Sequence, residues 1–118
     1  MVELSSDARM YDPTEIYKSL GMQEIAAELL RIDDQCFEAF QLRFLNARSR
    51  LIVFIGLKGT VTVNNAFLDT DLSYRAFHVM TRRLRDKGMI KMQIDENDRR
   101  VKHLSLTDAV LDFATWLK

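Results

Sequence analysis

Residues 72–107 read LSYRAFHVMTRRLRDKGMIKMQIDENDRRVKHLSLT, and this stretch decides the predicted fold. In its first part Phe77, Met80 and Leu84 recur at helical spacing, so they form a buried face and leave the bases exposed. Ser73 is a suitable N-cap for this helix, and Gly88 ends it. Two runs of alternating apolar and polar residues follow, on either side of the charged turn DENDRR. They predict a β-hairpin directly after the basic helix, which spans residues 73–87.

The segment before the basic helix completes a known motif. Residues 60–63 are short and β-branched, which is typical of a brief strand. Asn64 can cap a short helix that runs through Thr70, and a tight turn then leads into the basic helix. A short helix, a tight turn and a second, exposed basic helix form a helix-turn-helix, and the hairpin after it is a wing. The predicted fold class is therefore mainly α with a small β-hairpin (α+β), a winged helix-turn-helix.

The N-terminal segments are also predicted to be helical. Asp12-Pro13 marks a helix start, and residues 1–12 are expected to be flexible. Residues 13–45 carry apolar side chains at near-helical spacing. Asp33 and Asp34 can cap a second helix within this range, but no loop signal separates the two parts, so one long bent helix is the alternative. The apolar stripe of the second part consists of Cys36, Phe37, Phe40, Phe44 and Leu45.

Two more helices complete the predicted architecture. Asn46 starts a helix that is apolar nearly all round, which indicates an interior position, and Lys58-Gly59 stops it. Thr107 caps a last helix, in which Trp116 is an anchor in the core or in an interface. We expect a single winged-helix domain over residues 13–118. Its parts are N-terminal helices that dimerise (13–45), a DNA-binding core (46–107) with the wing at 89–106, and a C-terminal helix (107–118).

The charges are distributed unevenly along the chain. The 118 residues carry a formal net charge of zero, which by itself argues against a nucleic-acid partner. However, acids dominate residues 1–41 and bases dominate residues 73–103. Such asymmetry between the two halves predicts one basic working face.

Cysteine use and hydropathy bear on the compartment. Cys36 is the only cysteine, so a disulfide within one chain is excluded and a reducing, intracellular setting is expected. No apolar run approaches the roughly 18 residues of a membrane span. Residues 1–15 lack the basic and apolar regions of a signal peptide. We expect a cytoplasmic protein with no membrane partner.

The basic helix supplies the predicted DNA contacts. In a helix-turn-helix the second helix enters the major groove with its N-terminal end first. The exposed side chains of its first turns are Ser73, Tyr74, Arg75 and His78. Arg75 is the best candidate for a base contact because its guanidinium can engage guanine O6 and N7 together, whereas Ser73 and Tyr74 can instead bond phosphate. Further phosphate contacts are expected from Arg82, Arg83 and Lys87. The alternative is a solvated charged helix face that binds nothing.

The wing supplies a second predicted contact. Arg99 and Arg100 lie at the hairpin tip, beside the basic helix. An arginine there can enter the minor groove, which is narrow over A·T tracts and has an enhanced negative potential. Asp98 is expected to hold one of the two arginines in the turn while the other projects, and Arg100 is the preferred candidate to project. The alternative is a polar turn with internal salt bridges.

Residues 60–107 as a whole resemble the winged helix-turn-helix of the MarR family of bacterial transcription regulators. The run LSYRAFHVMTRRLRDKGMI is similar to the recognition helix of that family and the Lys-Gly step after it, and DENDRRVKHLSLT is similar to its wing. The resemblance implies binding to double-stranded DNA as a homodimer. It places Ser73, Tyr74, Arg75 and His78 at the major groove and Arg99 or Arg100 in the minor groove.

The sequence departs from the family at two places. Where the family usually has glycine in the turn, this chain has Asp71, which tolerates a left-handed conformation less readily. The sequence ends at Lys118, about one helix after the wing, whereas family members continue with longer helices that build the dimer interface. The dimer contacts are therefore expected from Ile16, Leu20, Ile25, Leu29, Phe37, Phe40, Phe113, Trp116 and Leu117.

Other kinds of site have little support in the sequence. Cys36 lies on an aromatic stripe with no base nearby in sequence, which favours buried packing over a peroxide-sensing thiol. His78 and His103 are the only histidines and have no partners at metal spacing, so no metal and no cofactor is expected. No phosphate loop, nucleophile elbow or carboxylate pair indicates an enzyme. The alternative function is a winged-helix adaptor or antirepressor that meets an acidic protein and does not read DNA. The sequence identifies no small-molecule effector.

Overall fold

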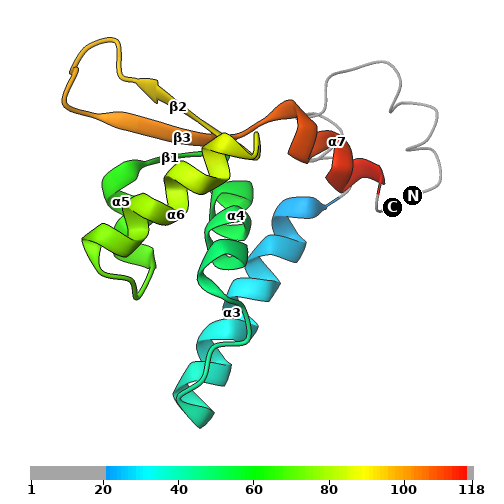
Figure 1. The fold of residues 1–118 in the computed structure, drawn as a ribbon. Helices are drawn as coiled ribbons and strands as arrows, with labels where there is room; N and C mark the ends of the chain where they lie inside the picture. Colours follow the sequence, from blue (N-terminus) through cyan, green and yellow to red (C-terminus); the bar gives the residue numbers. More distant parts are fainter. Residues whose placement is uncertain (1–20, 117–118) are drawn as a thin grey trace.

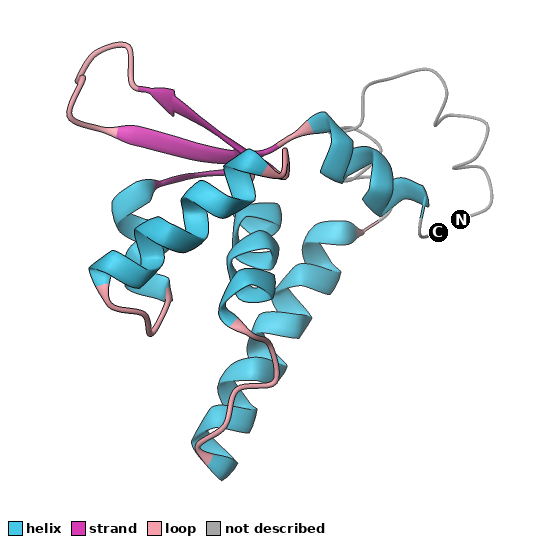
Figure 2. Cartoon of the chain, in the orientation of Figure 1, coloured by secondary structure: helices cyan, strands magenta, loops and turns pink. Residues whose placement is uncertain are grey.

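The computed structural model, which describes residues 21–116, has helices packed along one side of a small sheet, and the hairpin of the sheet projects beyond them (Figures 1 and 2). In chain order the elements are α3 (Met22–Phe40), α4 (Ala47–Lys58), β1 (Thr60–Thr62), α5 (Val63–Asp69), α6 (Tyr74–Asp86), β2 (Ile90–Ile94), β3 (Lys102–Leu106) and α7 (Asp108–Trp116). This architecture confirms the predicted fold class. The expectations for residues 1–12, for a helix start at Asp12-Pro13 and for Ile16, Leu20 and Leu117 lie outside the described residues.

α3 runs without a break through the two aspartates. The prediction that Asp33 and Asp34 cap a second helix is wrong, and the alternative of one continuous helix is confirmed over Met22–Phe40. Phe44 and Leu45, predicted on the apolar stripe of this helix, lie instead in the loop after it. The helix begins after Gly21, whose φ of 75° lies in the left-handed region. Asp33 is 0 % exposed, and its Oδ1 accepts the backbone N–H of Leu45 at 2.7 Å. This carboxylate therefore joins two segments of the chain instead of starting a helix.

α3 and α4 form an antiparallel helical hairpin that extends away from the sheet (Figure 1). The chain turns after α3 at Gln41, which has a φ of 63° and donates its N–H to the carbonyl oxygen of Phe37 at 2.8 Å. Asn46 caps α4 as predicted, because its side chain accepts the N–H of Ser49 at 2.8 Å. Gly59 ends the helix, also as predicted, with a φ of 88° that favours glycine.

β3 lies in the middle of the three-stranded antiparallel sheet, between β1 and β2. β2 and β3 are the arms of the predicted hairpin, with Ile90 opposite Leu106. β1 pairs with the other edge of β3, where Val61 lies opposite Leu104. The strand itself was predicted, but its partner was not, because the pairing joins segments far apart in sequence. The wing is thereby anchored to the start of the helix-turn-helix.

The core lies where α4, α5, α6 and the sheet meet. Its buried side chains are Leu51, Ile55, Val61, Ala66, Phe77, Met80, Leu84, Ile90 and Leu104. Three of them are the apolar face predicted for the basic helix, and Phe77 among these is 0 % exposed. Burial of one such side chain contributes about 1.5–3 kcal/mol. The buried face therefore fixes the rotation of α6 about its axis and turns the bases to solvent.

The helix-turn-helix differs from the prediction in two local details. α5 begins two residues earlier, because Thr62 is the cap and its side chain accepts the N–H of Asn65 at 3.1 Å. Asn64, the predicted cap, already lies inside the helix. Asp71 does not adopt a left-handed conformation, since the described residues contain only one non-glycine residue with positive φ, at the end of α3. Its carboxylate instead pairs with Arg43, at 3.0 Å.

The start of α7 is tied to the end of α6. Thr107 precedes α7 as predicted, but its hydroxyl donates to the carbonyl oxygen of Gly88 at 2.6 Å. The Thr107 N–H bonds the carbonyl oxygen of Met89 at 3.1 Å. The residue therefore fastens the C-terminal helix to the strand that follows α6. The predictions for Phe113 and Trp116 concern side chains that lie outside the described part of the structure.

The end of α3 farthest from the sheet keeps apolar side chains in solvent. Phe40 is 71 % exposed and Phe37 is 38 % exposed. The Arg43 guanidinium lies over the Phe37 ring, 4.6 Å from its centroid. Cys36, next to these rings, is only half-buried, so the prediction of buried packing for this thiol is wrong. The reason is that no described residue covers the aromatic stripe beside it.

Candidate nucleic-acid interface

α6 is the basic helix of the helix-turn-helix, and it starts as the sequence predicts. Ser73 is the N-cap, and its Oγ accepts the N–H of Ala76 at 3.2 Å. Tyr74, Arg75 and His78 follow on the exposed side of the helix. Because the apolar side of α6 is buried in the core, these side chains are held at the surface.

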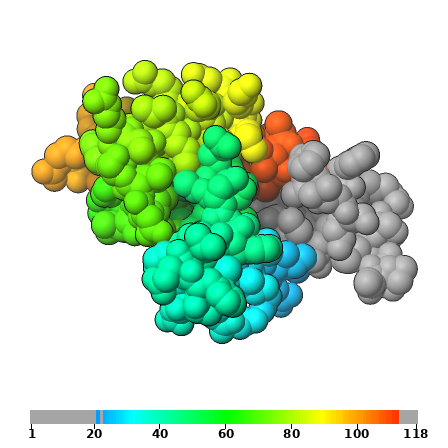
Figure 3. All heavy atoms as spheres, turned by 60° about the horizontal axis from the view of Figure 1, so that its bottom comes forward, coloured from blue at the N-terminus to red at the C-terminus, as the bar shows by residue number. Residues whose placement is uncertain are grey.

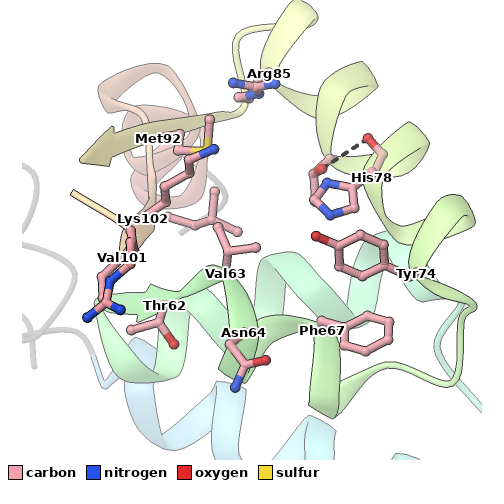
Figure 4. A pocket seen from close by; sticks show the side chains of 13 residues that line it. Thr62, Val63, Asn64, Phe67, Tyr74, His78, Arg85, Met92, Val101 and Lys102 are labelled. Carbon is pink, nitrogen blue, oxygen red and sulfur yellow. Dashed lines mark hydrogen bonds between the residues drawn. The ribbon is translucent and has the colours of Figure 1, made fainter. Parts of the chain in front are cut away.

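A groove runs along one side of α6, between this helix, α5 and the hairpin (Figure 4). This wing-side groove has a volume of about 450 Å³. Tyr74, His78 and Arg85 line it from α6, and Arg100 and Lys102 line it from the hairpin. Figure 4 shows the α6 side chains on one wall of the cavity and Lys102 on the opposite wall. The groove is therefore bordered by cations from two elements.

A second groove runs along the other side of α6, between this helix and the start of α4. This α4-side groove has a volume of about 570 Å³. Its charged lining is Arg48 from α4 with Arg75 and Arg83 from α6, and its apolar lining is Ala47, Leu72, Ala76, Val79 and Met80. Figure 3 shows the first turns of α4 beside α6. α6 is thus a ridge with one groove on each side.

Aromatic contacts hold the α6 wall of the wing-side groove. Phe67 of α5 packs edge to face against Tyr74, with ring centroids 5.5 Å apart. The Tyr74 ring in turn lies 4.1 Å from the His78 ring, and Phe77 lies 5.6 Å from His78. Each such pair contributes about 0.5–1.5 kcal/mol beyond area burial. The contacts restrict the rotamers of Tyr74 and His78, so their polar atoms are positioned before a partner binds.

The bases of α6 and its C-cap take no part in holding the fold. All are exposed, and none forms an ion pair with another residue of the described part of the chain; they are Arg75, Arg82, Arg83, Arg85 and Lys87. Among the described residues that line the two grooves, none is an aspartate or a glutamate. Unpaired cations on one face create a positive potential that extends into solvent.

The predicted site residues fall into three groups, all of them exposed. The wing-side groove contains Tyr74, His78 and Arg100. The α4-side groove contains Ser73, Arg75 and Arg83. The remaining predicted residues line neither groove and are Arg82, Lys87 and Arg99.

Asp95 organises the hairpin tip. Its Oδ2 accepts the N–H groups of Asn97 and Asp98, both at 2.9 Å, and its Oδ1 lies 3.0 Å from Nε2 of His103 on β3. The hydrogen bond with His103 and those from the two backbone N–H groups lower the pKa of Asp95. The acids of this turn therefore shape the loop between the strands.

Asp98 holds Arg100 rather than Arg99. The Arg100 Nε donates to Oδ1 of Asp98 at 3.1 Å and its Nη2 donates to Oδ2 at 3.2 Å, which lowers the pKa of Asp98. Arg99 forms no side-chain hydrogen bond or ion pair within the described part of the chain. The expectation that one arginine is held by Asp98 is confirmed, but the choice of Arg100 as the free arginine is wrong.

A charge network behind the interface fastens the helix-turn-helix to α3 and α4. The Arg50 guanidinium of α4, 10 % exposed, makes a forked pair with Asp69 at the end of α5, with both contacts at 3.0 Å. Its Nη1 also donates to Oδ2 of Asp33 at 2.6 Å. Arg43 joins Asp33, at 3.1 Å, to Asp71 in the turn before α6, at 3.0 Å. Both ends of the turn are thereby tied to α3.

Opposing effects act on the ionisation of this network. Burial raises the pKa of Asp33, but hydrogen bonds from the Leu45 N–H, Arg50 and Arg43 outweigh burial, and its pKa is lowered overall. Burial likewise lowers the pKa of Arg50, and its pairs with Asp69 and Asp33 outweigh that effect and raise it. The network is therefore ionised at neutral pH.

Three cations at the grooves are not among the predicted contact residues, namely Arg48, Arg85 and Lys102. Arg85 lies in the last turn of the predicted basic helix. Lys102 has a sequence signal, because the alternation along the second arm of the hairpin places it on an exposed face of β3. Arg48 has no such signal. Its place beside α6 follows from the packing of α4 against the helix-turn-helix, which no local pattern describes.

Among the described residues, no group of three or more His, Cys, Asp and Glu side chains is placed to hold a metal ion. None of the described helices has the length and apolar content that a membrane crossing requires.

Solved structures of DNA-bound proteins share this fold. A mutant MarR from E. coli complexed with operator DNA is 16 % identical, with 84 % of this chain and 74 % of that chain covered and a TM-score of 0.51. Reduced AbfR bound to DNA is 18 % identical, with 79 % of this chain and 67 % of AbfR covered and a TM-score of 0.52. A mutant MepR from S. aureus bound to an oligodeoxyribonucleotide is 20 % identical, with 80 % of this chain and 69 % of MepR covered and a TM-score of 0.52. No protein-family model and no curated protein matches the sequence.

These likenesses concern the arrangement of the helices and the sheet. At identities of 16–20 % the shared property is the fold, and the resemblance predicted from residues 60–107 is confirmed at that level. This chain therefore has the winged helix-turn-helix fold of the MarR-type regulators.

Proposed function

We propose that this chain is a sequence-specific, double-stranded DNA-binding transcription regulator of the cytoplasm, without catalytic activity. The observation that carries the proposal is α6 itself, an exposed basic helix with a cation-lined groove on each side. The major groove of B-DNA is about 12 Å wide and accepts one α-helix, and a phosphate strand runs along each of its edges. The ridge and its two grooves are complementary to this shape and charge. Three solved structures of similar fold are bound to DNA, which supports the proposal.

The exposed side chains of α6 receive distinct roles in this proposal. Arg75 reads guanine O6 and N7, because it stands on the first turn of the helix and no carboxylate holds it. Tyr74 and His78 face the same major groove from the other side of the helix. The remaining predicted residues contact phosphates, namely Ser73, Arg82, Arg83 and Lys87.

The hairpin tip, residues 95–100, reaches the neighbouring minor groove. We assign the minor-groove contact to Arg99, because Asp98 holds Arg100 and leaves Arg99 without a partner among the described residues. Arg100 lines the wing-side groove and is assigned to a phosphate. A narrow minor groove over A·T pairs attracts an inserted arginine through its negative potential. The wing would therefore add a preference for A·T pairs beside the site of α6.

The working form in this proposal is a homodimer. α3 exposes apolar side chains that a monomer does not cover, with Ile25 48 % exposed, Ile32 38 % and Phe40 71 %. We assign the interface to residues 13–45 together with the C-terminal helix, residues 107–118, and DNA binding to residues 46–107. Two copies of α6 then occupy successive major grooves, about 34–36 Å apart, on a pseudo-palindromic site. Occupation of such a site excludes or recruits the polymerase.

Selection of bound sequences from a random duplex pool tests the proposal. The full chain is mixed with the pool at several salt concentrations, and the retained duplexes are sequenced. We expect a symmetric motif, with affinity that falls as salt rises because phosphate contacts release counterions. Retention of no duplex at low salt would contradict the proposal and favour the protein adaptor.

The Arg75→Ala variant tests the base contact on the selected duplex. Loss of a bidentate contact to guanine costs about 1–3 kcal/mol at one position of the site. The variant should therefore lose preference at that position and keep its affinity for random DNA, as measured by fluorescence anisotropy. Arg82→Ala is the matched control, because loss of a phosphate contact weakens specific and random duplexes alike. Equal losses on both duplexes for Arg75→Ala would contradict its assigned role.

A further inference from the structure

The α4-side groove contains a cation that the proposed roles do not use. Arg48, on the first turn of α4, shares the groove with Arg75 and Arg83 of α6. All three are exposed, and none has an ion pair with another residue of the described part of the chain. The described lining of this groove contains no acid. Three like charges on one groove repel each other, so the groove favours an anion that lies among them.

The arginines on either side of Arg48 in the chain have a different function. Arg43 is held by Asp33, Asp34 and Asp71, and Arg50 is held by Asp33, Asp34 and Asp69. On a helix two residues apart in sequence differ in direction by about 200°. Arg48 therefore points to the opposite side of α4 from Arg50, toward α6, where no described carboxylate meets it.

The apolar lining indicates which kind of anion fits. Leu72, Ala76 and Val79 line the groove with carbon atoms and lie between the charged groups of the two helices. A phosphodiester strand presents anionic oxygens to Arg48 and Arg83 and deoxyribose carbons to this lining, while Arg75 stays free for its base contact. The lining residues extend along α6 from Ser73 to Arg83, which corresponds to about 15 Å of helix. That length suits a strand better than a single small ion.

We propose that Arg48 binds the DNA strand at the edge of the major groove that faces away from the wing. On the other edge Arg85, Arg100 and Lys102 of the wing-side groove hold the opposite strand. α4 and the wing then clamp the duplex from both sides of α6 and fix the depth and tilt of that helix. The inference rests on the proposed function, because it requires α6 in the major groove.

Salt dependence of duplex binding tests the role of Arg48. The Arg48→Ala variant of the full chain is titrated against a fluorescein-labelled 24-base-pair duplex of mixed sequence at several salt concentrations, measured by anisotropy. Each lost phosphate contact reduces the magnitude of the slope of log K against log salt by about 0.9, which corresponds to a roughly eightfold loss of affinity at 0.1 M salt. The proposed homodimer contains two copies of Arg48, so Arg48→Ala should lose two such contacts. Lys58→Ala is the matched control, because it removes one exposed charge from the far end of the same helix, about 15 Å away. Arg48→Lys should keep the slope of the wild type.

The outcomes separate this inference from the proposed function. If the wild type binds no duplex at low salt, the proposed function fails. If the wild type binds and Arg48→Ala behaves like Lys58→Ala, only the role of Arg48 is wrong. Arg48→Gln keeps the length of the side chain and replaces Arg48→Ala if the latter unfolds, as judged by circular dichroism.

Replacement of single phosphates by uncharged methylphosphonates identifies the phosphate that Arg48 contacts. Methylphosphonates are placed one at a time in the duplex selected from the random pool. In each half-site of the duplex, the phosphate that Arg48 contacts is the one whose neutralisation weakens the wild type but not Arg48→Ala. The same experiment with Lys102→Ala should mark a phosphate on the opposite strand of that half-site. Both positions on one strand of the same half-site, or no position that distinguishes Arg48→Ala from the wild type, would overturn the clamp.

Discussion

Arg50→Met is the change that most directly tests how the helix-turn-helix is fastened to the rest of the fold. Arg50 is 8 % exposed and pairs with Asp33, which is 0 % exposed, and with Asp69 at the end of α5. Methionine has a similar length and fits an apolar space, so the substitution removes the charge without opening a large cavity. Asp69 then loses its forked pair, and Asp33 keeps the contacts with Arg43 and the Leu45 N–H.

The expected cost follows from the burial of these groups. Removal of one partner of a buried ion pair costs about 3–5 kcal/mol where the remaining charge is left uncompensated. Asp33 keeps its contact with Arg43, at 3.1 Å, so the expected cost lies at the lower end of this range, about 3 kcal/mol. This is a large part of the roughly 5–15 kcal/mol by which a domain is stable. Arg50→Lys should cost less, since an ammonium group keeps the charge but cannot form the fork with Asp69. We therefore expect the free energy of unfolding to be highest for the wild type, lower for Arg50→Lys and lowest for Arg50→Met.

Urea denaturation at pH 7, followed by circular dichroism, measures these differences. Arg31→Met is the matched control, because Arg31 pairs with Glu28 on the surface of α3, where both side chains are more than half exposed (55 % and 54 %). An exposed pair of this kind contributes little to stability, because water and salt screen the two charges. If the free energy of unfolding of Arg50→Met lies within about 1 kcal/mol of that of the wild type, the network does not fasten the helix-turn-helix to α3 and α4.

Three further predictions concern the core, the ionised network and the wing. Phe77→Ala should lower the free energy of unfolding by about 3–5 kcal/mol in thermal or urea melts, because Phe77 is 0 % exposed, whereas Tyr74→Ala, at a 63 % exposed position, should cost far less. The lowered pKa of Asp33 means that its contribution to stability is present above the pKa of an aspartate in the unfolded chain, about 4, and is lost as the pH falls through the lower folded pKa. The free energy of unfolding of the wild type, measured by urea denaturation at decreasing pH, should therefore fall below about pH 4, and an equally steep fall in Arg50→Met would contradict this. Asp95→Ala should speed amide hydrogen exchange at residues 96–100 and leave the core amides unchanged, because Asp95 accepts both N–H groups that shape the turn; unchanged exchange at the tip would show that the strands alone order it.

The recognition helix and the wing could be predicted because their signals are local. Ser73 and Gly88 bound α6 by caps that depend on a few neighbouring residues, and both act as expected. The period of apolar residues changes from helical to alternating after Gly88, and this change predicts where α6 ends and where the hairpin begins. Such signals need no knowledge of the remaining chain.

The pairing of β1 with β3 and the role of Asp33 could not be obtained in the same way. An aspartate that follows an apolar helical run is as suitable for a helix start as for an internal ion pair, and only the position of Arg50 decides between them. Likewise, the sequence of β1 indicates a strand but contains nothing that selects its partner. In both cases the deciding contact joins residues that are distant along the chain.

The zero net charge of the chain illustrates why a count of charges is a weak guide to a partner. Four aspartates, Asp33, Asp34, Asp69 and Asp71, are drawn toward Arg43 and Arg50 on the side of the fold where α3, α4 and the turn meet. These ion pairs stabilise the scaffold, and at the same time they keep carboxylates away from the two grooves beside α6. A carboxylate released from the network, for example Asp71 after loss of Arg43, would lie close to the start of α6 and repel phosphate. The same contacts that position the recognition helix therefore also keep its surroundings positive.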